Sequence, residues 1–138
     1  MKPCLKNIQS EIKKMAEEGR AARTEARQLA GKPRYYKQQS ARDTGHIARQ
    51  YLLAYHILRG KNPALSESPT TRWTGWDFPK TDAVLAIVEE YAEGTPEELE
   101  ALLRVGRQQL DMWRGAVRYG KAEAYHAALQ ADSVSEAA

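Results

Sequence analysis

Two pairs of side chains in this sequence have the spacing of metal ligands on a helix. Asp43 and His46 are three residues apart, and so are Glu123 and His126. Residues three apart lie on one face of a helix, and acid-x-x-His pairs of this kind hold the metal ions of dinuclear carboxylate proteins built from four helices. Each remaining helix would have to supply one further carboxylate, and the available ones are Glu17 or Glu25 and Glu89 or Glu90.

Two features of these pairs argue against a metal site. One pair has Asp where such sites use Glu, and none of the acids lies on an apolar face that would point into a bundle. We therefore expect no metal and no other cofactor, and a dinuclear carboxylate enzyme stays only as a third hypothesis. His56 lies in the apolar run LLAYHILRG and is expected to be a partly buried histidine with a hydrogen-bond partner.

No other motif supports catalysis. Cys4 is the single cysteine and lies at the start of the chain, no serine stands in a nucleophile-turn motif, and the glycines match neither phosphate-loop pattern. We therefore expect a protein that is not an enzyme. One cysteine excludes an intramolecular disulfide, and the sequence has neither a secretion signal pattern nor an apolar run of membrane-spanning length. These features predict a cytoplasmic protein that does not associate with membranes.

Basic residues are concentrated in the first half of the chain. Residues 1–62 contain 14 Lys and Arg against 5 Asp and Glu, a net charge of +9, whereas residues 63–138 carry −6. Such asymmetry is typical of a protein with a polyanionic partner. It is equally consistent with two halves that attract each other, within one chain or between copies.

The basic residues of the first predicted helix lie along one flank of it. An apolar row with alternating spacings of three and four runs from Leu5 to Leu29. On one side of this row lie Lys6, Lys13, Arg20, Arg23 and Arg27, and on the other lie Glu11, Glu18 and Glu25. A row of basic side chains on a helix can follow a nucleic-acid backbone, because Lys and Arg neutralise phosphates and release counterions. Alternatively, charges beside an apolar row select a partner helix.

The next segment adds aromatic residues to the charges. Tyr35 and Tyr36 stand between Arg34 and Lys37, and Arg42 and Arg49 follow seven residues apart. Aromatic rings beside cations are typical of surfaces that stack bases and neutralise phosphates. The predicted nucleic-acid-binding residues are therefore Lys13, Arg20, Arg23, Arg27, Arg34, Tyr35, Tyr36, Lys37, Arg42 and Arg49.

The elements that position these residues are predicted to be helices throughout. The pattern predicts helices over residues 4–30, 33–60 and 81–93, and a fourth of about 35 residues from Thr95 that bends at Gly115 or Gly120. Thr95 and Glu98 form a capping box, with Pro96 at the first helical position. We expect an all-α, four-helix antiparallel bundle-like domain over residues 1–130. It divides into a basic hairpin (1–62), a loop (63–80) and an acidic half (81–130), and a flexible tail (131–138) follows.

The predicted loop contains an unusual share of the aromatic residues. Trp73, Trp76 and Phe78 include two of the three tryptophans and the only phenylalanine. Loops of this length are uncommon unless they are functional or disordered, and an aromatic-rich loop is a poor candidate for disorder. One interpretation is a strap whose aromatic rings close the end of the bundle. The other is a loop that binds a protein through these three side chains.

Two functions follow from these observations. The first is a nucleic-acid-binding accessory protein that contacts the phosphate backbone of DNA or RNA through the basic hairpin, with little sequence specificity. The second is a protein-interaction module, such as an oligomeric adaptor or an inhibitor of a larger complex carried by a phage or another mobile element. A protein partner or self-association would serve the second function.

Overall fold

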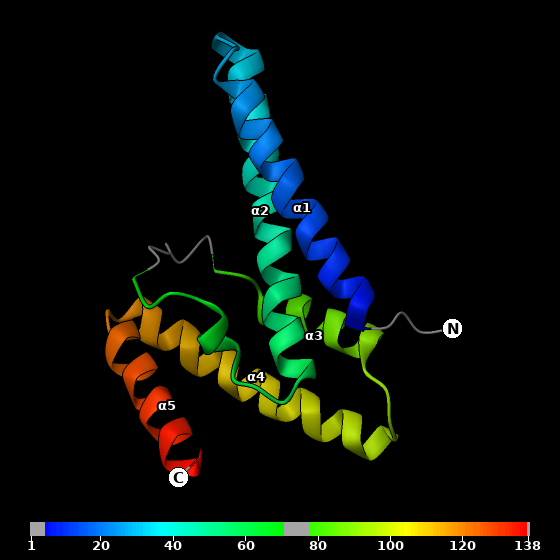
Figure 1. The fold of residues 1–138 in the computed structure, drawn as a ribbon, viewed down its shortest axis with the longest axis vertical. Helices are drawn as coiled ribbons and strands as arrows, with labels where there is room; N and C mark the ends of the chain where they lie inside the picture. The colour runs from blue at the N-terminus through cyan, green and yellow to red at the C-terminus, as the bar shows by residue number, and fades with distance from the viewer. Residues whose placement is uncertain (1–4, 71–77, 138) are drawn as a thin grey trace.

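The computed structural model is all-α and describes residues 5–70 and 78–137, with side chains placed as far as residue 132. The described residues form five α-helices and one short 3-10 helix, without a strand. In chain order these are α1 (Leu5–Ala26), α2 (Gly31–Leu58), η1 (Pro63–Ser66), α3 (Thr81–Tyr91), α4 (Pro96–Arg118) and α5 (Ala122–Ala137). The all-α class and the long hairpin of the first two helices are confirmed (Figure 1).

Helices α1 and α2 form an antiparallel hairpin that projects from the rest of the molecule (Figure 1). At 1.5 Å per residue, their 22 and 28 residues correspond to about 33 Å and 42 Å. Helix α1 ends at Ala26, four residues before the predicted end, and Gly31 opens α2 with φ of +63°. This left-handed conformation is readily accessible only to glycine, so the tight turn at the hairpin tip depends on Gly31.

The main hydrophobic core lies at the base of the hairpin. Ile8 of α1 and Leu53, Ala54 and Ile57 of α2 pack there against α3 and against Leu110 of α4. Ile47, closer to the tip of the hairpin on α2, is 44% exposed. The largest fully buried side chains of α2, Leu53 and Ile57, lie on the side of α2 away from α1. The buried face changes because only α1 contacts α2 near the tip, whereas α3 and α4 cover its other side at the base.

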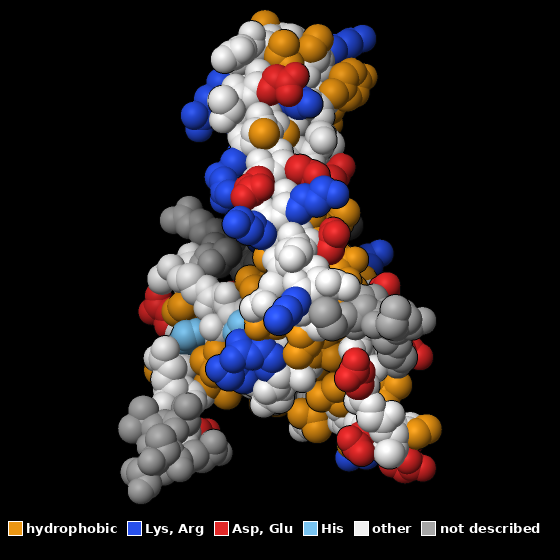
Figure 2. Space-filling model, turned by 45° about the vertical axis from the view of Figure 1, so that its right-hand side comes forward, with side chains coloured by type: hydrophobic (Ala, Val, Ile, Leu, Met, Phe, Trp, Pro, Cys, Tyr) orange, Lys and Arg blue, Asp and Glu red, His pale blue; other side chains and the backbone are white. Residues whose placement is uncertain are grey.

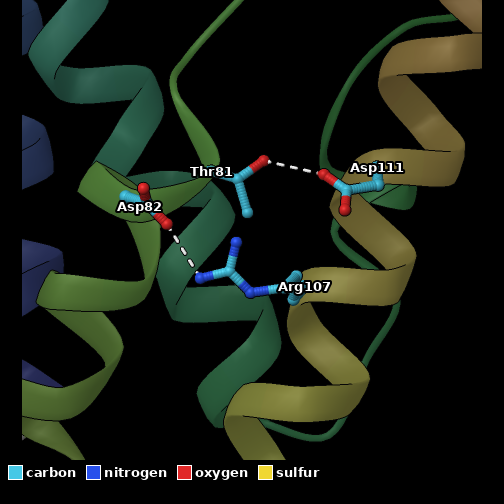
Figure 3. A network of polar contacts seen from close by, with 4 residues as sticks. All are labelled: Thr81, Asp82, Arg107 and Asp111. Carbon is cyan, nitrogen blue, oxygen red and sulfur yellow. Dashed lines mark hydrogen bonds and ion pairs between the residues drawn. The ribbon is translucent and has the colours of Figure 1, made fainter.

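Helix α4 runs across the base of the hairpin and not alongside it, so the arrangement differs from the expected four-helix antiparallel bundle (Figure 1). The crossing with α2 is close at Gly106, where an added Cβ would lie 3.1 Å from Cγ2 of Ile57. Polar contacts attach α4 to the start of α3: the Thr81 hydroxyl lies 3.0 Å from Asp111 Oδ1, and Arg107 forms an ion pair of 2.8 Å with Asp82 (Figure 3).

The predicted fourth helix is in fact two helices. Helix α4 ends at Arg118, and Gly120 has φ of +71°. The amides of Gly120 and Lys121 donate to the carbonyls of Val117 and Ala116 at 3.3 Å and 2.7 Å, the pattern of a Schellman C-cap. Helix α5 then turns aside and packs on the second cluster of the core, formed by Ala64, Phe78 and Trp113. It continues to Ala137, through most of the segment expected to be a flexible tail.

Candidate nucleic-acid interface

The charged flanks of α1 and α2 are related by a simple rule of helix geometry. The residues of each helix that face the other helix form its contact line. Because successive residues are rotated by about 100° around the helix axis, a residue that directly follows a contact-line residue lies on one flank, and a residue that directly precedes it lies on the other. In α1 the contact line includes Ile12, Gly19 and Ala26. Each is followed by a basic residue and preceded by a glutamate.

Two contacts show which flanks of α1 and α2 share a side of the hairpin. Glu25, which precedes the α1 contact line, forms an ion pair of 3.0 Å with Lys37 of α2. On the opposite flank, Nη2 of Arg23 lies 3.9 Å from the position that a Cβ on Gly45 would occupy. Both contacts agree with the geometry of antiparallel helices, in which the flanks that follow the two contact lines lie on the same side.

The basic residues of the two helices consequently lie on one side of the hairpin. Arg42 and Arg49 of α2 directly follow contact-line residues Ala41 and Ala48. We call this surface the basic face, and its residues are Lys13, Arg20, Arg23, Arg27, Arg42 and Arg49. All six side chains are exposed, and Lys13, Arg20 and Arg27 repeat about every 10 Å because they are seven residues apart.

The acidic side chains of the hairpin lie away from the basic face. Glu11, Glu18 and Glu25 lie on the opposite flank of α1, while Glu17 and Asp43 are two positions from the contact lines and therefore on the outer sides of the helices. Asp43 accepts a hydrogen bond of 3.1 Å from Gln39. Figure 2 shows basic side chains along one edge of the hairpin, with acidic and further basic side chains interspersed on the side that faces the viewer.

The remaining predicted hairpin residues lie elsewhere. Lys37 is half-buried on the opposite flank, where it pairs with Glu25. Arg34 is exposed at the tip, in the first turns of α2. Tyr35 and Tyr36 are exposed beside it, with ring centroids 5.7 Å apart and planes inclined by 68°. Tyr35 is seven residues before Arg42 and so extends the basic face to the tip.

Phe78 is buried in the second cluster of the core. Its ring is 5% exposed and packs with Ala64 and Trp113. The guanidinium of Arg114 lies 5.1 Å from the ring centroid, and Arg114 donates a 2.8 Å hydrogen bond to the carbonyl of Pro79. This position agrees with the strap interpretation for Phe78. Trp73 and Trp76, the other two predicted protein-binding residues, lie outside the described residues.

The histidines and acids do not form a metal site where the structure can be described. Among the side chains of residues 5–70 and 78–132, no group of three or more His, Cys, Asp or Glu is close enough to hold a metal ion. Burial lowers the pKa of His56 below its ordinary value, the Leu52 backbone partly opposes this effect, and the positive charges of Arg59 and Lys61 lower the pKa further. His56 therefore favours the neutral form.

The sequence interpretation missed an apolar row on the outer side of α4. Val105, Met112 and Tyr119, the residue that caps the end of α4, are seven residues apart, and all three are exposed. The more regular row of buried residues, which includes Gly106, Leu110 and Trp113, dominated the pattern of this helix. The spacing of seven was the signal that could have revealed the second row.

No helix of the described part of the chain is long and apolar enough to cross a bilayer.

Comparisons with known proteins do not add a functional assignment. No protein-family model matches the chain, and no curated protein and no solved structure shows significant similarity to it.

Proposed function

We propose that the protein binds DNA or RNA through the basic face of the α1–α2 hairpin. The observation that carries this proposal is the position of the basic flanks of two helices on one side of a projecting hairpin. Six exposed cations lie there, and the acids of both helices point elsewhere. The hairpin tip stands clear of the acidic half of the chain (Figure 1), which argues against a basic face that serves only to attract that half.

The chemistry of the basic face suits phosphate contacts more than base readout. Lys and Arg that follow a helix axis neutralise successive phosphates, and the release of condensed counterions drives such binding. Contacts of this kind position a protein on the backbone and carry no sequence information. We therefore infer an accessory protein with little sequence preference.

The dependence of affinity on salt concentration tests this function. If the six cations of the basic face contact about six phosphates, a plot of the logarithm of the association constant against the logarithm of salt concentration should have a slope of about −5 on duplex DNA. Fluorescence anisotropy with a labelled duplex of arbitrary sequence, titrated between about 50 mM and 200 mM salt, measures it. Absence of binding to both DNA and RNA at the lowest salt concentration would contradict the proposal.

A second function, self-association through α4, is favoured by its exposed apolar row. The first turn of α4 carries Glu97 and Glu98, and its last turn carries Arg118. We infer that a second copy of the chain packs on this helix in antiparallel orientation, which brings the acidic end of each helix to the basic end of the other. Val105 of one copy would then face Met112 of the other. One helix pair buries little area, so we expect a dimer with a dissociation constant of about 1 µM or weaker.

Substitution of Met112 tests the dimer. Met112→Lys places a charge in the centre of the row and should make the protein monomeric at concentrations where the wild type is partly dimeric. Sedimentation velocity over a concentration series measures this change. Ala21→Lys adds the same charge at an exposed position of α1 and should leave the dimer intact. A wild type that is monomeric throughout the series, or equal effects of the two variants, would rule out this interface.

A further inference from the structure

Two tyrosine rings are exposed at the tip of the hairpin, and neither belongs to the two clusters of the core. Tyr35 and Tyr36 are 61% and 64% exposed, and they contact each other edge to face. Aromatic side chains bury a large apolar area when they pack, so an exposed pair offers a ligand a large gain from covering the rings. The turn between α1 and α2 does not require them, because Gly31 makes that turn.

The surroundings of the rings are cationic. Arg27 and Arg34 flank the turn, and Tyr35 stands in line with Arg42 and Arg49 because these three residues are seven apart. The first turn of α2 contains no acidic residue. Glu25, in the last turns of α1, is neutralised by its ion pair with Lys37 on the opposite flank. A ligand of the tip should therefore combine negative charge with flat apolar surfaces.

We propose that the hairpin tip binds unpaired bases of single-stranded nucleic acid by stacking them on Tyr35 and Tyr36, while the basic face holds the adjoining backbone. This inference rests on the proposed nucleic-acid function and specifies the form of its ligand. In a duplex the faces of the bases are covered by their neighbours, so the rings could offer it only their hydroxyl groups. In a single strand the faces are accessible, and every base has one, so stacking tolerates any sequence.

The hydroxyl groups provide the competing explanation for these tyrosines. A tyrosine can donate a hydrogen bond to a phosphate of either a single strand or a duplex. Replacement by phenylalanine removes this hydrogen bond and keeps the ring, whereas replacement by alanine removes both. The two substitutions separate stacking from phosphate binding, and both positions are exposed enough that neither should disturb the fold.

The experiment compares two ligands and three forms of the protein at one low salt concentration. The ligands are a fluorescein-labelled oligodeoxythymidylate and the duplex that it forms with its complement, and anisotropy measures their affinities. The wild type should bind the single strand more tightly. Tyr35→Ala with Tyr36→Ala should weaken single-strand binding about tenfold or more and duplex binding less than about threefold. Tyr35→Phe with Tyr36→Phe should keep both affinities within about threefold of the wild type.

Other outcomes overturn the inference in distinguishable ways. Equal losses for phenylalanine and alanine on both ligands would show a hydroxyl–phosphate contact. Full single-strand affinity in the alanine variant would show that the tip does not touch the ligand. In both cases the proposed function stands, because the wild type still binds. If the wild type binds neither ligand, the proposed function fails and this inference fails with it.

Discussion

Replacement of Arg20, Arg23 and Arg27 together by glutamate is expected to lower the affinity for nucleic acid by more than about a hundredfold at 0.1 M salt. These residues form half of the basic face and stand next to the hairpin tip. A slope of about −0.9 per phosphate means that each contact raises the association constant about eightfold for every tenfold decrease in salt concentration. Loss of three contacts should therefore also reduce the slope of the salt titration from about −5 to about −3.

A matched variant separates the basic face from net charge. Glutamate at Arg104, Arg118 and Lys121 changes the charge of the protein by the same amount, at exposed positions on α4 and directly after it. Charges beyond about 10 Å are largely screened at 0.1 M salt, so this variant should bind within about threefold of the wild type. Equal losses in the two variants would mean that overall charge, and not the hairpin, determines binding. Circular dichroism of both variants checks that the helices are retained.

The largest expected effect on stability is that of Trp113→Ala, which should lower the free energy of unfolding by about 3–5 kcal/mol. The indole is completely buried and packs with Phe78 and Ala64. The ring of Tyr125 in α5 lies 5.9 Å from it, and the indole Nε1 donates a 3.0 Å hydrogen bond to Glu67 Oε2. The substitution leaves a cavity and removes the hydrogen-bond donor to the Glu67 carboxylate. The loss is a large share of the total free energy of unfolding, which for a domain is about 5–15 kcal/mol.

Urea denaturation followed by far-UV circular dichroism measures this loss. Gln108→Ala is the control, because Gln108 is exposed on the same helix and its substitution should change the free energy of unfolding by less than about 0.5 kcal/mol. A Trp113→Ala protein as stable as this control would mean that the second cluster of the core contributes little to the fold.

The sequence alone determined those features that depend on neighbouring residues. The cap of α4 is one: the Thr95 hydroxyl accepts the amide of Glu98 at 3.2 Å, as the capping box predicts. The row of buried residues on α4, which includes Gly106, Leu110 and Trp113, is another. The separation of basic and acidic flanks on α1 also follows from spacing alone, because a regular helix converts sequence distance into angle.

The tertiary structure decided how these elements combine. The heptad spacing of α4 continues in the sequence beyond Gly120, yet the helix ends before this residue. The left-handed C-cap and the packing of α5 on Trp113 outweigh a continued helix. Ile57 is buried and Ile47 exposed because α3 and α4 cover only the base of α2, which no periodicity within α2 reveals. The sequence determined that each hairpin helix has a basic flank. Only the antiparallel packing, with Arg23 over Gly45 and Glu25 on Lys37, placed both flanks on the same side.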